Sequence, residues 1–487
     1  MQQENSESAA VALPAAVRRY RDLPGPKGLP LLGNALQIDK TCIHEQFAAW
    51  SREYGAFFRA RIGPRRLLVI TDHAVIGSVL RDRPDRFRRP TNHGDIVREM
   101  GFEQGLFFAN DEAWKRQRRM VMAAFDPGHV KAYFPTLLSV VQRLEGRWRK
   151  AAQAGTNIDL QADLMRYTVD AIAGLAFGSD VNTLESDEDV IQRHLNRIFP
   201  AISRRVLASL PYWRYFKLPA DRALERSVGE VKRAIEGFIA QARQRMRDEP
   251  GLKSRPSNLL EAMIAAADEA GSGADDRDIA GNVFMMLVAG EDTTANTLAW
   301  MIDLLHRNPE ALRRAREEVR RVAPDATRFT LEQMADLEYV EACINETMRL
   351  KPVAPLMPSQ ANRDTTIGDV EVPAHTFVVG VMRRDSLDER YFPDPEKFDP
   401  DRWLADTSRA PNAKSTTRVS MPFGAGPRLC PGRYLALLEM KMAMAMLLGS
   451  FSLERVGTHD GKPAREMFAF AMGPVGLRMR LGMEPLV

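Results

Sequence analysis

A single cysteine on a glycine-rich loop is the strongest candidate for chemistry in this sequence. Residues 423–432 read FGAGPRLCPG, with a thiol at Cys430, and an apolar helical pattern follows over residues 434–448. Glycines let the backbone reach positive φ and approach a bulky flat group, and Pro431 suits the first turn of a helix. Backbone amides, the positive end of that helix and the nearby Arg428 all favour thiolate over thiol. Cys430 is therefore a candidate metal ligand or nucleophile.

The other cysteines help to narrow that choice. A buried free thiol is the ordinary fate of an isolated cysteine, and it suits Cys42 and Cys343 better than Cys430. The three positions have neither the pairing of a disulfide framework nor the spacing of a structural zinc site, so a reducing cytoplasm is the simplest setting. A nucleophilic cysteine needs an activating base, and no histidine or carboxylate is visibly paired with Cys430.

A second candidate site lies inside residues 275–306, the longest apolar-periodic helix of the sequence. Residues 289–294 read AGEDTT and place Asp292 and Thr293 in its middle. Polar groups within a buried helix are costly unless they are hydrogen-bonded or useful, and Gly290 would let a ligand approach the backbone. The plain alternative for Thr293 is a hydroxyl bonded back to the preceding turn. Because the same sequence also contains Cys430, we prefer the functional interpretation of Thr293.

Two more helices carry paired polar side chains. Asn110 can cap a helix on which Trp114 and Arg118 lie one turn apart, so that both can donate hydrogen bonds to one carboxylate. Glu346 and Arg349 stand three residues apart and can form an ion pair, although exposed pairs of this kind contribute little.

The loop of Cys430 resembles, position by position, the Phe-x-x-Gly-x-Arg-x-Cys-x-Gly signature of the cytochrome P-450 family. Three further motifs of that family occur in the same order, namely Trp-x-x-x-Arg, Ala-Gly-x-Asp-Thr and Glu-x-x-Arg. The resemblance implies that Cys430 is the axial ligand of the iron of haem b. The cofactor-binding residues that it implies are Trp114, Arg118, Ala289, Gly290, Phe423, Gly424, Arg428, Cys430 and Gly432.

The same resemblance assigns roles to the other motifs. It implies that Asp292 and Thr293 organise proton delivery to iron-bound oxygen. Glu346 and Arg349 would form a buried structural network with Arg402, which follows in the run 398–403. Family members often supply a basic residue to the second haem propionate ten residues after the Arg349 position, where this chain has Ser359; Arg363 lies four residues further. The propionate set is therefore Trp114, Arg118 and Arg428, with a fourth member open.

Apolar residues from four segments are candidates for substrate contact. Residues 93–108 read as an irregular stretch rich in large apolar side chains, which either line a pocket or seal the stretch onto the core, and the resemblance favours the pocket. The candidates are Phe102, Phe107, Phe108, Val288, Val353, Ala354, Leu356, Met467, Phe468 and Phe470.

The periodicity predicts a mainly α fold with a minor β region, and the resemblance implies haem between a long central helix and the Cys430 loop. Helical segments are expected over residues 45–54, through most of 130–250, and over 275–306 and 434–448. Strands are expected over 57–62 and 66–71 around Gly63-Pro64, and over 467–481 with a turn at Gly473-Pro474.

Composition excludes several classes of protein. The 487 residues are 45% apolar and 27% charged, with a formal net charge of +4. This composition suits a globular protein and gives no reason to expect nucleic-acid binding.

Residues 1–22 hold no apolar run long enough to cross a bilayer. They are expected to be a flexible N-terminus, and 23–487 a single catalytic domain that starts with a proline-rich extended segment over 23–33. Such a segment follows the membrane anchor in microsomal members, so its occurrence without an anchor favours a soluble, bacterial-type, cytoplasmic member.

The resemblance implies a monooxygenase that inserts one oxygen atom from O2 into a hydrophobic small molecule. Electrons would come from NAD(P)H through a separate ferredoxin or flavodoxin with its reductase, because no dinucleotide or iron–sulfur motif follows the cysteine loop. A basic helix with Lys115, Arg116 and Arg119 could steer an acidic partner. The alternatives are a peroxide-driven peroxygenase or peroxide isomerase on the same fold, and a non-catalytic haem-binding sensor.

Overall fold

The computed structural model describes residues 17–186, 190–208, 210–404 and 416–483, and within them helices predominate over short strands. The predicted mainly α fold with a minor β region is therefore confirmed. The α-helices are α1 (Ile43–Tyr54), α2 (His73–Arg81), α3 (Thr91–Glu99), α4 (Asp111–Ala124), α5 (Pro127–Ala154), α6 (Leu160–Phe177), α7 (Val190–Val206), α8 (Pro219–Asp248), α9 (Leu259–Asp268), α10 (Asp276–Arg307), α11 (Pro309–Val322), α12 (Leu331–Ala335), α13 (Glu338–Leu350), α14 (Arg383–Ser386), α15 (Asp401–Leu404), α16 (Thr416–Ser420) and α17 (Arg433–Ser450).

The strands form four small sheets. Five strands make the largest sheet in the order β2-β3-β9-β6-β4, and three smaller sheets have the orders β1-β8-β7, β10-β13-β5 and β11-β12. In the largest sheet, β3 and β9 are parallel and the other neighbours are antiparallel. The strands are β1 (Arg18–Arg19), β2 (Phe57–Ile62), β3 (Arg65–Ile70), β4 (Phe87–Arg88), β5 (Ile158–Asp159), β6 (Leu356–Ala361), β7 (Thr365–Ile367), β8 (Val370–Val372), β9 (Phe377–Val381), β10 (Phe451–Gly457), β11 (Arg465–Phe468), β12 (Met472–Val475) and β13 (Arg478–Met483).

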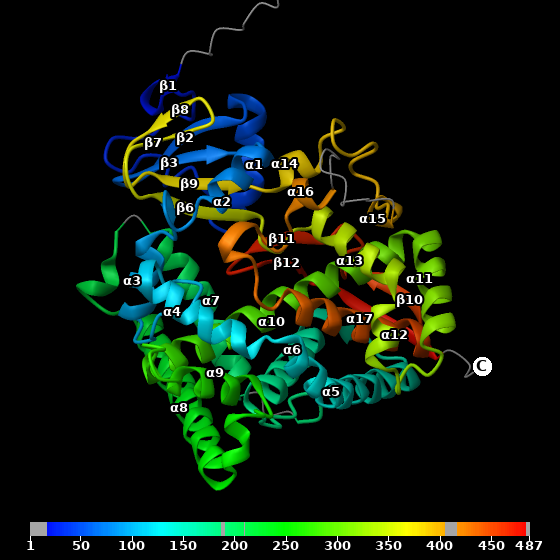
Figure 1. Ribbon diagram of the computed structural model, residues 1–487. Coiled ribbons are helices and arrows are strands. Elements are labelled where there is room, and N and C mark those ends of the chain that lie inside the picture. Colours follow the sequence, from blue (N-terminus) through cyan, green and yellow to red (C-terminus); the bar gives the residue numbers. More distant parts are fainter. Residues whose placement is uncertain (1–16, 187–189, 209, 405–415, 484–487) are drawn as a thin grey trace, which may run out of the picture.

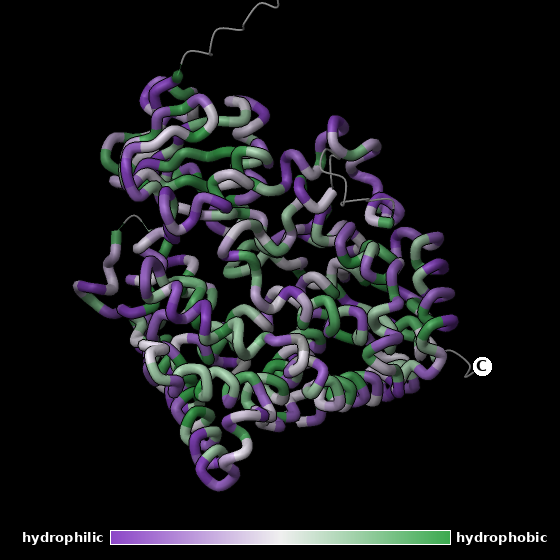
Figure 2. Tube along the Cα trace, viewed as in Figure 1, coloured by the Kyte–Doolittle hydropathy of each residue, from purple (hydrophilic) through white to green (hydrophobic). Residues whose placement is uncertain are grey.

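Helix α10 forms the centre of the helical part. The five-stranded sheet lies at one end of the molecule, and α10 runs through the middle of the helices (Figure 1). The Asp275 side chain caps α10 by accepting hydrogen bonds from the amides of Arg277 and Asp278. Helix α17 is apolar on nearly every face, which is the pattern of a fully buried helix. Hydrophilic residues gather on outer helices such as α11 (Figure 2).

Several sequence predictions agree with the structure, and two are wrong. The expected helices match α1, α10 and α17, and the expected hairpin matches β2 and β3. The stretch 93–108 is not irregular throughout, because α3 occupies its first part and buries Ile96 and Val97 on one face. The C-terminal turn does not lie at Gly473-Pro474, which belong to β12 and pair with β11 across a turn over residues 469–471.

The N-terminal segment 1–22 lies mostly outside the described residues. Its last part is held, since Arg18 and Arg19 pair with β8 and the Arg18 guanidinium forms an ion pair of 2.7 Å with Asp369. The segment 23–33 contains no helix, as its prolines and glycines predict.

Candidate functional site

The loop of Cys430 is held in a compact turn against the end of α2. The Cys430 amide donates to the Phe423 carbonyl at 3.1 Å. Gly424 and Gly426 have φ of +79° and +71°, as their residue type allows. A Cβ on Gly426 would lie 2.5 Å from the Leu80 carbonyl oxygen, so this glycine serves packing on α2, whereas Gly424 faces open space. Of the two glycines, only Gly424 fits the expected approach of a flat group.

The electrostatic environment of Cys430 differs in part from the prediction. Although the residue is exposed, protein encloses its thiol closely enough that burial raises the thiol pKa. A hydrogen bond from the Gly432 amide and the charges of Arg118 and Arg433 oppose this effect. The expected amide is present, but the cations that act on the thiol are Arg118 and Arg433 and not the expected Arg428. Helix α17 begins at Arg433 with Gly432 as its N-cap, so Pro431 precedes the helix.

The three residues predicted to hold propionates lie together beside this loop. Arg118 donates to the Leu429 carbonyl at 3.0 Å. Arg428 donates to the Ala109 carbonyl at 2.8 Å, and its guanidinium lies 4.8 Å from the centre of the Trp114 ring. Asn110 occupies the N-cap position of α4 but does not cap it; its side-chain oxygen accepts from Arg428 instead, at 3.1 Å.

Two arginines that the sequence did not indicate, Arg83 and Arg89, lie near Arg428, and we call these three residues the arginine cluster. Arg83 and Arg89 are both buried. The Nη1 of Arg83 and the Nε of Arg89 have no hydrogen-bond partner in the part of the chain that the structure describes, like the Nε of Arg428. Within the described ranges, none of these three guanidinium groups has a carboxylate at ion-pair distance. Burial and mutual repulsion lower the pKa of Arg83 to about 8 and of Arg428 to about 9, and burial lowers that of Arg89 to about 10. Such a cluster is costly unless an anion neutralises it.

Arg89 lies beside the place where the second propionate partner was expected. Ser359 is fully buried in β6 and Arg363 is exposed, so neither presents a cation to the cluster. Arg89 instead reaches β6 from the segment before α3, and its Nη1 lies 3.5 Å from the Pro358 carbonyl. The dense run of arginines over residues 81–89 was the signal that could have indicated it.

The predicted cofactor-binding and catalytic residues on α10 divide between two faces. Ala289 and Thr293 have open side chains, and the Thr293 hydroxyl donates to the Ala289 carbonyl at 2.8 Å. This is the back-bonded hydroxyl that was considered as the plain alternative. A Cβ on Gly290 would lie 2.8 Å from the Ile172 side chain of α6, so this glycine allows two helices to pack closely. The expected approach of a ligand to its backbone stays a prediction.

The side chain of Asp292 is buried and hydrogen-bonded to other polar groups. Its carboxylate accepts from the Asn296 side chain at 2.8 Å and from the Ala471 amide at 3.3 Å. Gln161 donates to Asn296 at 2.9 Å and extends the network to α6. Burial raises the pKa of Asp292 despite these hydrogen bonds. Asn296, one turn further along α10, is another residue that the motif did not indicate.

Glu346 and Arg349 form a fully buried bidentate pair. The Nε and Nη2 of Arg349 each lie 2.7 Å from a Glu346 oxygen, and both side chains have no exposed surface. Arg402 lies 3.4 Å from the same carboxylate, where it was expected. Trp403, which was not predicted, donates to Glu346 at 3.0 Å. The surface-pair alternative is therefore wrong.

The substrate candidates also separate by exposure. Phe107, Ala354, Leu356, Phe468 and Phe470 are partly open, and Met467 is exposed. Four others have at most 8% of their surface open and could contact a substrate only after moving: Phe102, Phe108, Val288 and Val353. Phe102 instead stacks on Phe284 with ring centres 3.9 Å apart.

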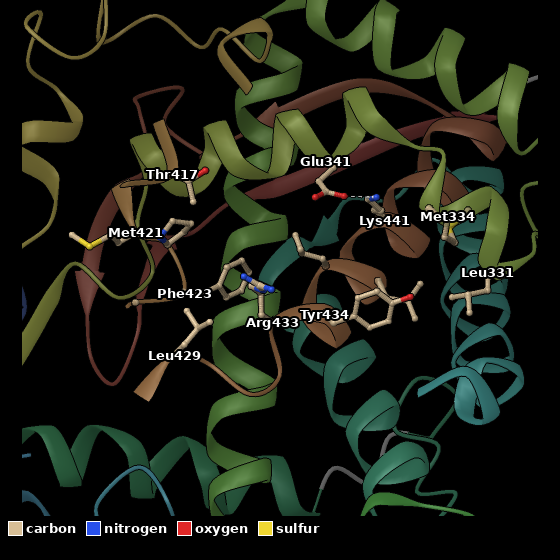
Figure 3. A pocket seen from close by; sticks show the side chains of 15 residues that line it. Leu331, Met334, Glu341, Thr417, Met421, Phe423, Leu429, Arg433, Tyr434 and Lys441 are labelled. Atoms are coloured by element: carbon tan, nitrogen blue, oxygen red, sulfur yellow. Dashed lines mark ion pairs between the residues drawn. The ribbon is translucent and has the colours of Figure 1, made fainter. Parts of the chain in front are cut away.

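A cavity of about 440 Å³ lies against the loop of Cys430. Figure 3 shows Phe423 and Leu429 of the loop, Tyr434 of α17 and the ion pair of Glu341 with Lys441 around it. A second cavity of about 670 Å³ shares Thr417, Met421 and Gly424 with the first and is lined by Arg81 and Arg418. The loop thus borders a hollowed, partly basic surface.

The expected steering helix needs a correction. Arg116 is not a free surface cation, because its guanidinium pairs with the buried Asp278 at 2.6 Å. Lys115 pairs with Glu112 at 2.7 Å, while Arg119 is exposed.

Among the helices of the described residues, none is both long enough and apolar enough to cross a membrane.

Comparisons with known proteins agree with the motifs. The protein-family model for cytochrome P-450 matches residues 23–481. Rabbit (Oryctolagus cuniculus) cytochrome P-450 3A6 is 26% identical over 89% of this chain and 86% of its own length. A chloroplastic carotene epsilon-monooxygenase of Arabidopsis thaliana is 28% identical over 84% and 76%. A self-sufficient cytochrome P-450 monooxygenase of Aspergillus niger is 27% identical over 94% of this chain but only 43% of that protein. The crystal structure of the cytochrome P450DA heme domain has the same fold, with a TM-score of 0.83 at 23% identity over 97% of this chain and 99% of that one.

Proposed function

Because the chain belongs to the cytochrome P-450 family of haem-thiolate monooxygenases, we propose that it inserts one oxygen atom from O2 into a hydrophobic organic molecule. The observation that carries this proposal is the buried arginine cluster beside the loop of Cys430. Among the described residues, the guanidinium groups of Arg83, Arg89 and Arg428 have no carboxylate partner, and a dianionic cofactor would supply one.

The residues present fit haem b. Cys430 would ligate the iron, and Trp114, Arg118 and the arginine cluster would hold the two propionates. Haem held by a thiolate supplies O2 binding and O–O cleavage. Phe423, Gly424 and Gly432 would complete the loop around the ligand. The buried network of Glu346, Arg349 and Arg402 would support the loop indirectly, because it binds the segment 386–403 to α13.

Asp292 and Thr293 are proposed to manage protons. A raised pKa makes the Asp292 carboxyl a readier proton acceptor than an exposed aspartate. Thr293 presents its hydroxyl beside Ala289 on the open face of α10. Because Asp292 is bound to Asn296 and Ala471, a proton would pass to Thr293 through a movement of the carboxyl group or through water.

The substrate is proposed to lie between α10 and a small aromatic group. The Phe470 ring lies 5.9 Å from that of Phe107 and 6.1 Å from that of Phe199. With Ala289 on the open face of α10, these side chains offer apolar contacts, which supports a hydrophobic substrate.

A separate ferredoxin or flavodoxin is proposed as the electron donor, with docking at the cavity of Figure 3. Arg433 lines this cavity, and Arg81 and Arg418 line its neighbour, so the exposed surface next to the Cys430 loop is basic. An acidic partner would be attracted there. The composition and unpaired cysteines support a cytoplasmic location.

The experiment is turnover with a surrogate ferredoxin, its reductase and NADPH across lipid, terpenoid, steroid and aromatic libraries. A monooxygenase shows substrate-dependent NADPH use matched by oxygenated product. A sensor shows neither, and a peroxygenase forms product only with added peroxide. If reduction of the iron by ferredoxin does not slow as salt rises, the basic docking surface is wrong.

A further inference from the structure

The loop between α3 and α4 is tied to α10 by buried polar contacts that the proposed chemistry does not use. The Asn282 side chain accepts from the Leu106 amide at 2.9 Å and donates to the Asp278 carbonyl at 2.7 Å. It also donates to the side chain of Gln117 at 3.2 Å. Gln117 in turn donates to the Gln104 carbonyl at 2.9 Å and to the Asp278 carboxylate at 2.7 Å. Two buried amide side chains thus bind two main-chain groups of the loop.

These polar contacts flank a direct contact between two backbones. A Cβ on Gly105 would lie 2.2 Å from the Gly281 carbonyl oxygen, and a Cβ on Gly281 would lie 2.8 Å from the Gly105 nitrogen. Neither position has room for a side chain, so the loop rests on the surface of α10 itself. Phe102 adds a third attachment by stacking on Phe284.

The residue held by this attachment is Phe107. It follows Leu106 directly, its ring lies near Phe470, and the Arg89 guanidinium lies 4.1 Å from its ring centre. Two residues later, the Ala109 carbonyl accepts from Arg428. Phe107 therefore lies between one anchor on α10 and another in the arginine cluster.

We propose that Asn282 and Gln117 are positioning residues that hold Phe107 as a fixed wall of the substrate site. The inference rests on the proposed function, because it takes the space beside Phe107 and Phe470 as the place of the substrate. A wall held before binding saves the cost of ordering a loop around each ligand. Selectivity then comes from a preformed surface and not from closure of the loop.

The first test measures the attachment without any catalysis. Amide hydrogen exchange of the haem-loaded, substrate-free protein is compared for wild type, Asn282→Leu and the matched control Asn308→Leu. Asn308 lies at the other end of the same helix and donates to the Leu304 carbonyl at 2.7 Å, away from the loop. Losing the buried partner of the Leu106 amide should speed exchange in peptide 101–110 about 10- to 100-fold. Exchange at the wild-type rate would overturn the proposal.

The second test measures the wall by its effect on ligands of different size. 4-Phenylimidazole, which carries a phenyl group, is titrated spectroscopically beside imidazole, which lacks it. Asn282→Leu should weaken 4-phenylimidazole about 10-fold and leave imidazole unchanged, while Asn308→Leu changes neither. Equal weakening of both ligands would show damage to the haem site and contradict a positioning role.

The two tests separate this inference from the proposed function. Hydrogen exchange reports on the loop and not on catalysis. If Asn282→Leu exchanges faster while the wild-type protein shows no monooxygenase activity, the inference about the attachment is supported and the proposed function is rejected. If Asn282→Leu does not fold, Gln117→Leu removes the neighbouring link to the Gln104 carbonyl and should give the same pair of effects. Wild-type exchange in that variant also counts against the proposal.

Discussion

Replacing Arg89 by methionine should weaken haem retention without unfolding the protein. Burial lowers the pKa of Arg89 to about 10. Since each tenfold change in the ionisation constant corresponds to about 1.4 kcal/mol, keeping this guanidinium charged without a partner costs about 3 kcal/mol. A haem propionate would remove that cost. Because Arg83 and Arg428 would also neutralise the propionates, we expect a loss of about 1.4–3 kcal/mol, or about 10- to 100-fold faster haem release.

The assay is haem transfer from the ferric protein to excess apomyoglobin, followed in the Soret band. Arg363→Met is the matched control, because it is the same substitution at the exposed arginine that motif spacing had suggested. The reasoning is refuted if Arg89→Met keeps wild-type release, or if Arg363→Met accelerates release as much.

Three further predictions concern the buried network around Glu346 and Arg349, the buried Glu439, and the proposed proton path through Asp292 and Thr293. Arg349→Met leaves the buried Glu346 charge with too few partners and should cost about 3–5 kcal/mol, seen as a lower urea midpoint and loss of haem; the exposed Arg390→Met should be neutral. Burial raises the pKa of Glu439 to about 8, and its Oε1 has no hydrogen-bond partner among the described residues. Between pH 4.5 and 8 the folded protein keeps the proton of Glu439, whereas the unfolded chain, in which this group ionises near 4.5, has lost it. The free energy of unfolding should therefore fall by about 3–5 kcal/mol as the pH rises from 4.5 to 8. Urea unfolding of Glu439→Gln should lack that part of the pH dependence, and an unchanged slope would contradict it. Thr293→Ala and Asp292→Asn should divert reducing equivalents to peroxide and cut product per NADPH by about 10-fold or more, whereas unchanged coupling would remove both residues from the proton path.

The motif residues could be predicted because their chemistry demands particular residue types at fixed local spacing. Trp114 with Arg118, and Glu346 with Arg349, each lie within one turn of a helix, so periodicity alone places them on one face. The long helices α10 and α17 were found for the same reason.

Contacts between distant segments could not be predicted in this way. Arg89 reaches β6 across roughly 270 residues of sequence. The run of arginines over residues 81–89 marks a basic segment, but it does not show which of these arginines is buried beside β6. The contact of Gly290 with Ile172 of α6 was not predicted, because a glycine within a helix indicates close approach but does not identify what approaches. The turn at residues 469–471 was misplaced because Gly473 and Pro474 are turn formers that here lie in β12, where Gly473 packs against Asn296.

The central claim is that Cys430 ligates haem iron through its thiolate. The most direct measurement is the absorption spectrum of the dithionite-reduced protein under carbon monoxide, for wild type and Cys430→Ala, with Cys42→Ala and Cys343→Ala as controls. The account predicts the red-shifted Soret band of a haem thiolate in wild type and both controls, and its loss in Cys430→Ala. A wild-type protein without that band, or a Cys430→Ala variant that keeps it, would contradict the claim.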